Sequence, residues 1–296
     1  RSTLFPYTTL FRSSYGYDDG EHFLKFKGDM GEGILKGRFD WATLSHSFIN
    51  HLADKLPELP GLPTKRKRTN NDFTIELYLS DSEAFKKLLD VPLVLHEPFS
   101  LQAKIDDINH YVNLRGRMPS FNYNNDEYER GELTVSSPSD SLRCDLTLVK
   151  NLGNGRKLDM NLTTMAAENN VNATFWWDNN EQDGKAMSGM LNAIARLYLG
   201  VNGKPEAQVR MLPSSLVLAG TEWGIEPCDI IYSAKHLMVD HFLIHHDQQF
   251  LLLDGIASDL PADTLSLNLK DVEVAYVLDL VIARSEERRV GKECRS

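Results

Sequence analysis

Residues 236–274 read HLMVDHFLIHHDQQFLLLDGIASDLPADTLSLNLKDVEV, and this stretch carries the clearest fold signal in the chain. Three leucines precede Asp254, a turn containing Pro261 follows, and apolar and polar residues then alternate from Leu265 to Lys270. Period-two alternation places one set of side chains on one face of a pleated strand. The stretch therefore predicts a strand, a turn and a second strand, which we interpret as one unit of an extended β architecture.

The two ends of the chain are related through their coding DNA. Residues 1–13 read RSTLFPYTTLFRS and residues 284–296 read RSEERRVGKECRS. Residues 284–296 can be encoded by a DNA sequence whose reverse complement, read in frame, encodes residues 1–13. That DNA segment is a sequencing-library adapter, so we interpret both ends as assembly artefacts and exclude them from fold reasoning. Residues 14–283 are then expected to be an internal fragment of a longer protein.

The composition is acidic, with a formal net charge of −10 for the complete chain. The two ends contribute seven Lys or Arg residues and three Glu residues, so residues 14–283 have a net charge of −14. Phosphate contacts need clustered Lys and Arg, and we therefore expect no nucleic-acid partner. No apolar run approaches the ~18–20 residues of a membrane-spanning helix. The length is compatible with one or two domains or with a repeat array.

Strand patterns recur along the whole natural part, with turn signals about every 8–12 residues. Two helical patterns interrupt them, at about residues 41–56 and 81–90. In the first pattern, apolar residues recur every three to four positions behind Asp40, a plausible helix cap. His46 and His51 are interpreted as exposed residues of its polar face. We expect a β segment with both helices over residues 14–120 and repeated β units over residues 121–283.

The alternation also has a consequence for function. Each predicted strand is apolar on one face only, so that face of the sheet must pack against an apolar layer that shields it from water. In a sandwich, this would be a second sheet. In a curved open groove, it would be a ligand of hydrocarbon character or a partner strand.

Five phrases of the sequence carry a family resemblance, through their order more than through any one motif. They are GRFDWATLSHSFINHLADKLPELPGLP, HYVNLRGRMPSFNY, GELTVSSPSDSLRCDLTL, PCDIIYS and LLLDGIASDLPADTLSLNLKDVEVAYVLDLV. Together they resemble the translocation and assembly module (TamB) family of the AsmA-like superfamily. The similarity covers essentially all of residues 14–283.

The resemblance implies a segment of a long envelope protein of diderm bacteria. Such proteins are tethered to the inner membrane by an N-terminal helix, cross the periplasm as a β-taco or groove lined with apolar residues, and meet an outer-membrane partner of the Omp85 class. The implied roles are phospholipid passage between membranes and outer-membrane protein assembly, with lipid or an unfolded outer-membrane protein as client. The anchor and the docking module fall outside this sequence, so we expect a conduit segment. The family supplies no catalytic residue and no cofactor.

The resulting fold expectation is a mainly β, elongated, repeat-like antiparallel sheet curved into a groove, with two short helices near the N-terminal third. The residues expected to line the groove are Leu158, Met160, Leu162, Val171, Phe175, Leu191, Leu197, Leu265 and Leu267. The alternative is that these side chains fill a closed core. Which of the two holds depends on whether a second layer covers the apolar face.

Enzymatic interpretations find little support in the motifs. His241 and His245 on one strand lie about 13 Å apart, too far to share a metal ion. No Gly-x-Ser-x-Gly or His-Glu-x-x-His motif occurs, and we expect neither an enzyme nor a metal site. Cys144 and Cys228 are not in a Cys-x-x-Cys spacing, and a disulfide between them is left open.

An alternative function is an extracellular carbohydrate-binding β-sandwich or glycosidase accessory domain. The pair Trp176 and Trp177 and the acidic loops would suit it. Adjacent strand residues point to opposite faces, so only one of these indoles can be presented to a sugar. A glycosidase would also need two convergent carboxylates, which a sequence does not reveal.

Overall fold

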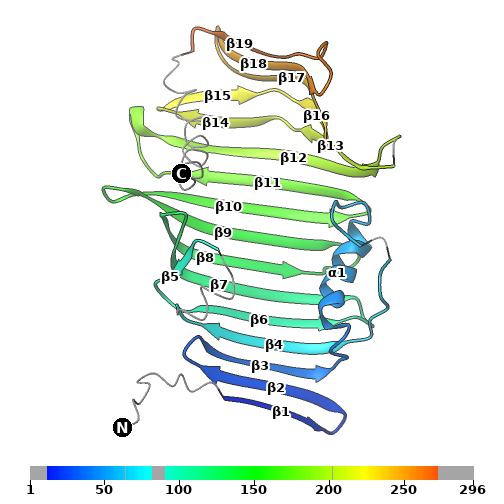
Figure 1. Cartoon of the computed structure of the whole chain (residues 1–296). Helices are drawn as coiled ribbons and strands as arrows, with labels where there is room; N and C mark the ends of the chain where they lie inside the picture. Colours follow the sequence, from blue (N-terminus) through cyan, green and yellow to red (C-terminus); the bar gives the residue numbers. More distant parts are fainter. Residues whose placement is uncertain (1–11, 64, 82–90, 202, 273–296) are drawn as a thin grey trace, which may run out of the picture.

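The computed structural model describes residues 12–63, 65–81, 91–201 and 203–272. All strands of this part belong to one antiparallel sheet of 19 strands, and its only α-helix is α1 (Leu44–Lys55) (Figure 1). This confirms the mainly β expectation. Residues 82–90 of the second expected helix lie outside the described residues.

The strands have the following bounds. They are β1 (Arg12–Asp18), β2 (Glu21–Gly28), β3 (Gly31–Arg38), β4 (Asp72–Leu79), β5 (Leu93–Leu95), β6 (Phe99–Asp106), β7 (Tyr111–Tyr123), β8 (Asp126–Ser136), β9 (Leu142–Gly153), β10 (Arg156–Ala167), β11 (Asn170–Asp178), β12 (Met187–Leu199), β13 (Pro205–Met211), β14 (Ser214–Leu218), β15 (Thr221–Ile225), β16 (Cys228–Ser233), β17 (His236–His246), β18 (Gln249–Ser258) and β19 (Leu265–Lys270). A short 3-10 helix, η1 (Asp183–Lys185), precedes β12.

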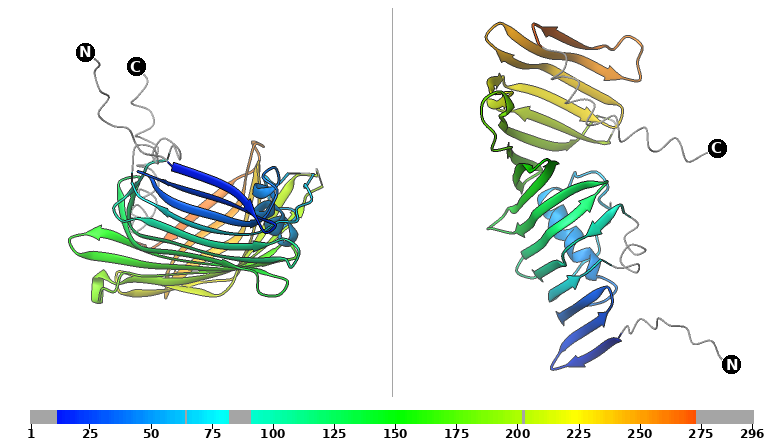
Figure 2. Two further views of the ribbon diagram at one scale, coloured as in Figure 1. Left: turned by 90° about the horizontal axis from the view of Figure 1, so that it is seen from below. Right: turned by 90° about the vertical axis from the view of Figure 1, so that its left-hand side faces the viewer.

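The sheet is a meander of hairpins. Strands β7 to β12, for example, each pair antiparallel with the next strand along the chain. Several hairpins close through two residues with positive φ, among them Asn124–Asn125 and Asn154–Gly155. Such turns have the twist that matches paired strands. The turn after β10 is of the same kind, with φ of 51° at Glu168 and 62° at Asn169. Viewed from below, the sheet is curved rather than flat (Figure 2).

Three pairs of short strands occupy the positions of three long strands. The first half of β12 pairs with β14 and its second half with β13. A proline lies at each of the three breaks: Pro98 between β5 and β6, Pro213 between β13 and β14, and Pro227 between β15 and β16. Proline has no backbone N–H to donate to the ladder. Strand pairing is therefore interrupted at each proline and resumes after it, so the sheet stays continuous.

Helix α1 lies at one margin of the sheet, beside the ends of several strands (Figure 1). It begins after Thr43, whose side chain makes no capping hydrogen bond, so the expectation that Asp40 caps the helix is wrong. Asp40 instead forms the preceding turn, where its backbone oxygen accepts a hydrogen bond from Thr43 N at 3.0 Å. Within the described residues, no helix is long and apolar enough to cross a membrane.

In the part of the chain that the structure describes, buried apolar side chains form three separate clusters and no single central core. The first cluster centres on Phe73 and Ile105, the second on Leu56 and Leu197, and the third on Trp223. Helix α1 contributes Leu44 and Leu52 to the margins of the first two clusters. Cys144 and Cys228 are free thiols, so no disulfide links them.

Candidate functional site on the apolar face

One face of the sheet carries rows of apolar residues that are directly paired from strand to strand. One row runs from β2 to β12 through Phe26, Gly33, Leu77, Leu101, Gly116, Leu133, Leu146, Leu162, Phe175 and Leu191. The adjacent row runs through Leu24, Leu35, Ile75, Ala103, Leu114, Val135, Cys144, Thr164, Ala173 and Ala193. Cross-strand neighbours of this kind contact one another along the face and shield one another from water. No charged residue interrupts either row.

The nine predicted lining residues all belong to this face. Leu162 pairs with Phe175, and Phe175 pairs in turn with Leu191. Leu197 is buried in the cluster around Leu56, so the helix covers it. The remaining members lie along the same face: Leu158 and Met160 in β10, Val171 in β11, and Leu265 and Leu267 in β19.

The middle of this apolar face is only half-buried. Leu146, Leu162 and Phe175 belong to none of the three buried clusters. Leu267, near the far end, is 51% exposed. All strands of the described residues belong to one sheet, so these residues supply no separate second sheet to cover this face. In this part of the chain, the apolar row is therefore a surface, whereas a sandwich would make it a core.

The opposite face is polar and is crossed by ion pairs. Arg210 on β13 donates two hydrogen bonds to Asp229 on β16, at 3.0 and 2.9 Å. These bonds hold the pKa of the Asp229 carboxyl below its usual value. Lys157 contacts Glu129 at 2.5 Å in the same manner. The sheet is thus amphipathic, with one face suited to water and the other to hydrocarbon.

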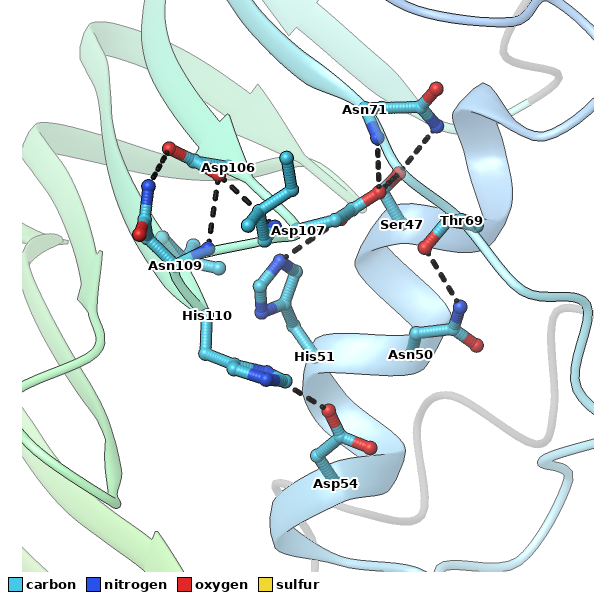
Figure 3. Close-up of polar contacts among 12 residues, drawn as sticks. Ser47, Asn50, His51, Asp54, Thr69, Asn71, Asp106, Asp107, Asn109 and His110 are labelled. Carbon is cyan, nitrogen blue, oxygen red and sulfur yellow. Dashed lines mark hydrogen bonds and ion pairs between the residues drawn. The ribbon is translucent and has the colours of Figure 1, made fainter.

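Helix α1 borders the apolar face and is attached to it by apolar contacts at both ends. Polar contacts attach the middle of the helix (Figure 3). The polar contacts converge on Asp107, in the turn between β6 and β7. Ser47 Oγ and Asn71 N each donate to Asp107 Oδ2 at 2.8 Å. Asn71 Nδ2 donates to Ser47 Oγ, also at 2.8 Å. This network is buried, with Ser47 0% and Asn71 2% exposed.

His51 completes the network, and the expectation that it is an exposed polar-face residue is wrong. It is 8% exposed, and its Nε2 lies 3.2 Å from Asp107 Oδ1, within ion-pair distance but outside hydrogen-bond geometry. Burial lowers the pKa of His51 below its ordinary value of 6.5, although the Asp107 carboxylate acts in the opposite direction. Burial disfavours the charged imidazolium. The helix therefore turns a polar stripe toward the sheet, which the spacing of its leucines did not indicate.

Sequence reasoning missed Asp107, Asn71 and Ser47 as a unit. Ser47 and His51 are one helical turn apart, and His51 was expected to lie on the solvent-exposed face of the helix. Their partners come from a loop and a turn distant in the sequence. The one local signal of this network is the spacing of Ser47 and His51, which are four residues apart and therefore lie on the same side of the helix.

The histidines of β17 make separate contacts. His245 Nε2 lies 2.9 Å from Glu226 Oε1, whereas the backbone N of His241 donates to Asp254 Oδ1 at 2.9 Å. In the described part of the chain, no three His, Cys, Asp or Glu side chains are arranged to hold a metal ion.

Comparison with protein-family models, with curated proteins and with solved structures gives no match for this chain.

Proposed function

We propose that this chain is a conduit segment of a non-enzymatic envelope-biogenesis protein of the TamB type, and that its apolar face carries phospholipid acyl chains between two membranes. The observation that carries the proposal is the uninterrupted apolar row from β2 to β12, which no second layer covers in the described residues. The sequence resemblance supports the same function.

The physical basis is the hydrophobic effect. Each CH2 group of an acyl chain that leaves water contributes about 0.8 kcal/mol. A continuous row such as Leu146, Leu162 and Leu191 offers apolar contact at every strand, so a chain moving along it meets no polar barrier. The headgroup stays in water, because the sheet has no second layer above it in the described part.

Hydrogen-bond accounting favours lipid over polypeptide as the occupant of this face. Within the sheet, backbone N–H and C=O groups between β2 and β18 pair with neighbouring strands. An unfolded polypeptide lying on the apolar face would bury its own backbone groups without partners, which costs free energy. An acyl chain has no such groups. A polypeptide client would instead add to a sheet edge, where backbone groups are available.

The same proposal places the segment in the periplasm of a diderm bacterium. In this proposal, the protein is tethered to the inner membrane and engages an Omp85-class outer-membrane protein. The amphipathic sheet suits an aqueous compartment, because its polar face is covered by cross-strand ion pairs such as Arg210 with Asp229. Turnover of a defined substrate that is lost on substitution of one carboxylate would contradict the non-enzymatic role.

The test is native mass spectrometry of the chain purified from bacterial cells, to detect co-purifying phospholipid. We expect bound lipid in the wild-type chain and its loss in Phe175→Asp and Leu191→Asp. Each of these changes places a charge in the apolar row.

Matched controls are Thr174→Asp and Asn192→Asp, which place the same charge on the same two strands but on the polar face. Circular dichroism verifies that all four variants keep their β structure. A wild-type chain without lipid, or equal lipid loss in both pairs of variants, would overturn the proposal.

A further inference from the structure

The polar face carries an exposed indole on β11. Trp176 pairs with Asn161 on β10 and Met190 on β12, and it is 39% exposed. Its neighbour Trp177 faces the apolar side, where it stacks on Phe175 with ring centroids 5.4 Å apart. The alternation predicted for this pair is thus confirmed. An indole offers both an apolar ring face and an N–H donor to a ligand.

Trp176 forms one side of an open hollow of about 570 Å3 on the polar face. The hollow crosses four strands along one row of paired residues: Glu132 on β8, Thr147 on β9, Asn161 on β10 and Trp176 on β11. The two middle residues are short and the two outer residues are long. The short pair therefore forms the floor, and the indole and the β8 side chains form the walls.

The floor has unused hydrogen-bonding capacity. Among the described residues, the Thr147 hydroxyl and the Asn161 side-chain nitrogen have no protein partner, and Asn161 Oδ1 has only a long contact of 3.4 Å with Thr163 Oγ1. Neighbouring strands lie about 4.8 Å apart, so these two groups are spaced to reach two substituents of one small ring.

The charged groups around the hollow are already paired with one another. Arg130 contacts Asp159 at 2.8 Å, and Glu132 contacts Arg115 at 2.5 Å. A charged ligand would have to compete with these existing pairs. A neutral ligand with one apolar ring face and several hydroxyl groups would instead use the indole and the floor without disturbing them. A saccharide ring has this chemistry.

We propose that this hollow binds a neutral carbohydrate, with the sugar ring stacked on Trp176 and its hydroxyls bonded to Asn161 and Thr147. Thr147, Asn161 and Trp176 lie on the face opposite the proposed lipid conduit, although Leu148 and Met160 of the conduit face also border the hollow. A protein that handles lipid on one face would then contact glycan on the other.

The experiment is isothermal titration calorimetry of the complete chain with two neutral oligosaccharides, cellohexaose and chitohexaose. We expect binding of at least one, and a loss of affinity of about tenfold or more in Trp176→Ala, equivalent to about 1.4 kcal/mol. Trp176→Phe is expected to keep most of the affinity, and Asn161→Ala to weaken it. Met190→Ala is the matched control, since Met190 is exposed beside Trp176 but does not line the hollow.

Three results would overturn the proposal: no binding of either oligosaccharide, unchanged affinity in Trp176→Ala with its β structure intact, or tighter binding of the anionic hexagalacturonate. The amount of co-purifying lipid is expected to be unchanged in Trp176→Ala. Failure of the carbohydrate site and failure of the lipid conduit are therefore distinguishable.

Discussion

His51 Nε2 lies 3.2 Å from Asp107 Oδ1, and this contact joins helix α1 to the turn between β6 and β7. Both side chains are nearly buried, with 9% and 6% of their side-chain surface exposed. The pair anchors the helix that borders the apolar face, so its chemistry affects the margin of the proposed conduit.

The His51 contact predicts a pH-dependent stability. The pKa of His51 is lowered below 6.5 in the folded chain by burial, so the unfolded chain binds the proton more readily. The free energy of unfolding is therefore expected to be at its maximum above about pH 6.5, to fall as the pH decreases from there toward the folded pKa, and to level off below it. Urea unfolding at pH 7.5 and pH 5.5 measures the difference.

The control for this prediction removes the titrating group. His51→Gln is expected to reduce the loss of stability between the two pH values, whereas His241→Gln, at an exposed position of β17, is expected to leave it unchanged. Equal pH dependence in the wild type and His51→Gln would contradict the prediction.

Asp107→Ala tests the network itself. The substitution leaves Ser47 Oγ and Asn71 N without their common acceptor. Because buried unsatisfied donors are costly, we expect the free energy of unfolding to fall by about 3 kcal/mol. Asp140→Ala is the comparison, since Asp140 pairs with Lys55 but is fully exposed, and we expect it to change stability only slightly. Chemical denaturation measures the free energy of unfolding of both variants. Similar losses of stability in the two would contradict the role of this network in anchoring the helix.

Gly255→Ala tests the backbone in the Asp-Gly motif of β18. Gly255 has φ of +116°, and a Cβ atom there would lie 2.2 Å from the backbone oxygen of Thr264. We expect a loss of more than about 2 kcal/mol in the free energy of unfolding. Gly155, with φ of +77° in an open turn, has nothing near its Cβ position, and Gly155→Ala is expected to cost about 1 kcal/mol. Thermal unfolding of the two variants compares them directly, and equal losses would show that the close approach is unimportant.

Two apolar substitutions compare a buried cluster of the sheet with an exposed position on its apolar face. Ile105 is 0% exposed in the first cluster, and Ile105→Ala is expected to cost about 2–5 kcal/mol. Leu267→Ala, at a half-exposed position of the same face, is expected to cost less than about 1 kcal/mol. A large cost at Leu267, measured by urea unfolding, would indicate that another layer covers it in solution.

Much of the strand pattern was predictable from the sequence, because period-two alternation is a local property. The sequence alternates through β19 and the second half of β12, whereas β18 is partly buried at every position and is marked by its run of leucines. The turn after β10 is also marked locally, since Asn169 readily adopts positive φ. Whether the apolar face is covered was not predictable, because that depends on the arrangement of distant segments.

The inward face of helix α1 shows why the candidate site was only partly predictable. Leucine spacing indicated a helix over residues 41–56, and the structure places it at residues 44–55. Its buried surface nevertheless includes Ser47 and His51, because Asn71 and Asp107 supply partners for them. A periodicity analysis scores polar residues as exposed and has no information on such partners.

The meander has a consequence for how the chain folds during synthesis. Each hairpin from β7 to β12 joins sequence neighbours, so each strand finds its partner as soon as the next strand has been made, and little loop-closure entropy is lost. Helix α1 is the exception. Glu58 N, just beyond its end, donates to Asn169 Oδ1 across 111 residues of sequence, and Leu56 packs against Leu197. The middle of the helix can therefore dock at Asp107 once β7 has been made, whereas its C-terminal end at Leu56 and Glu58 is attached only after β12 exists, as a late step in folding.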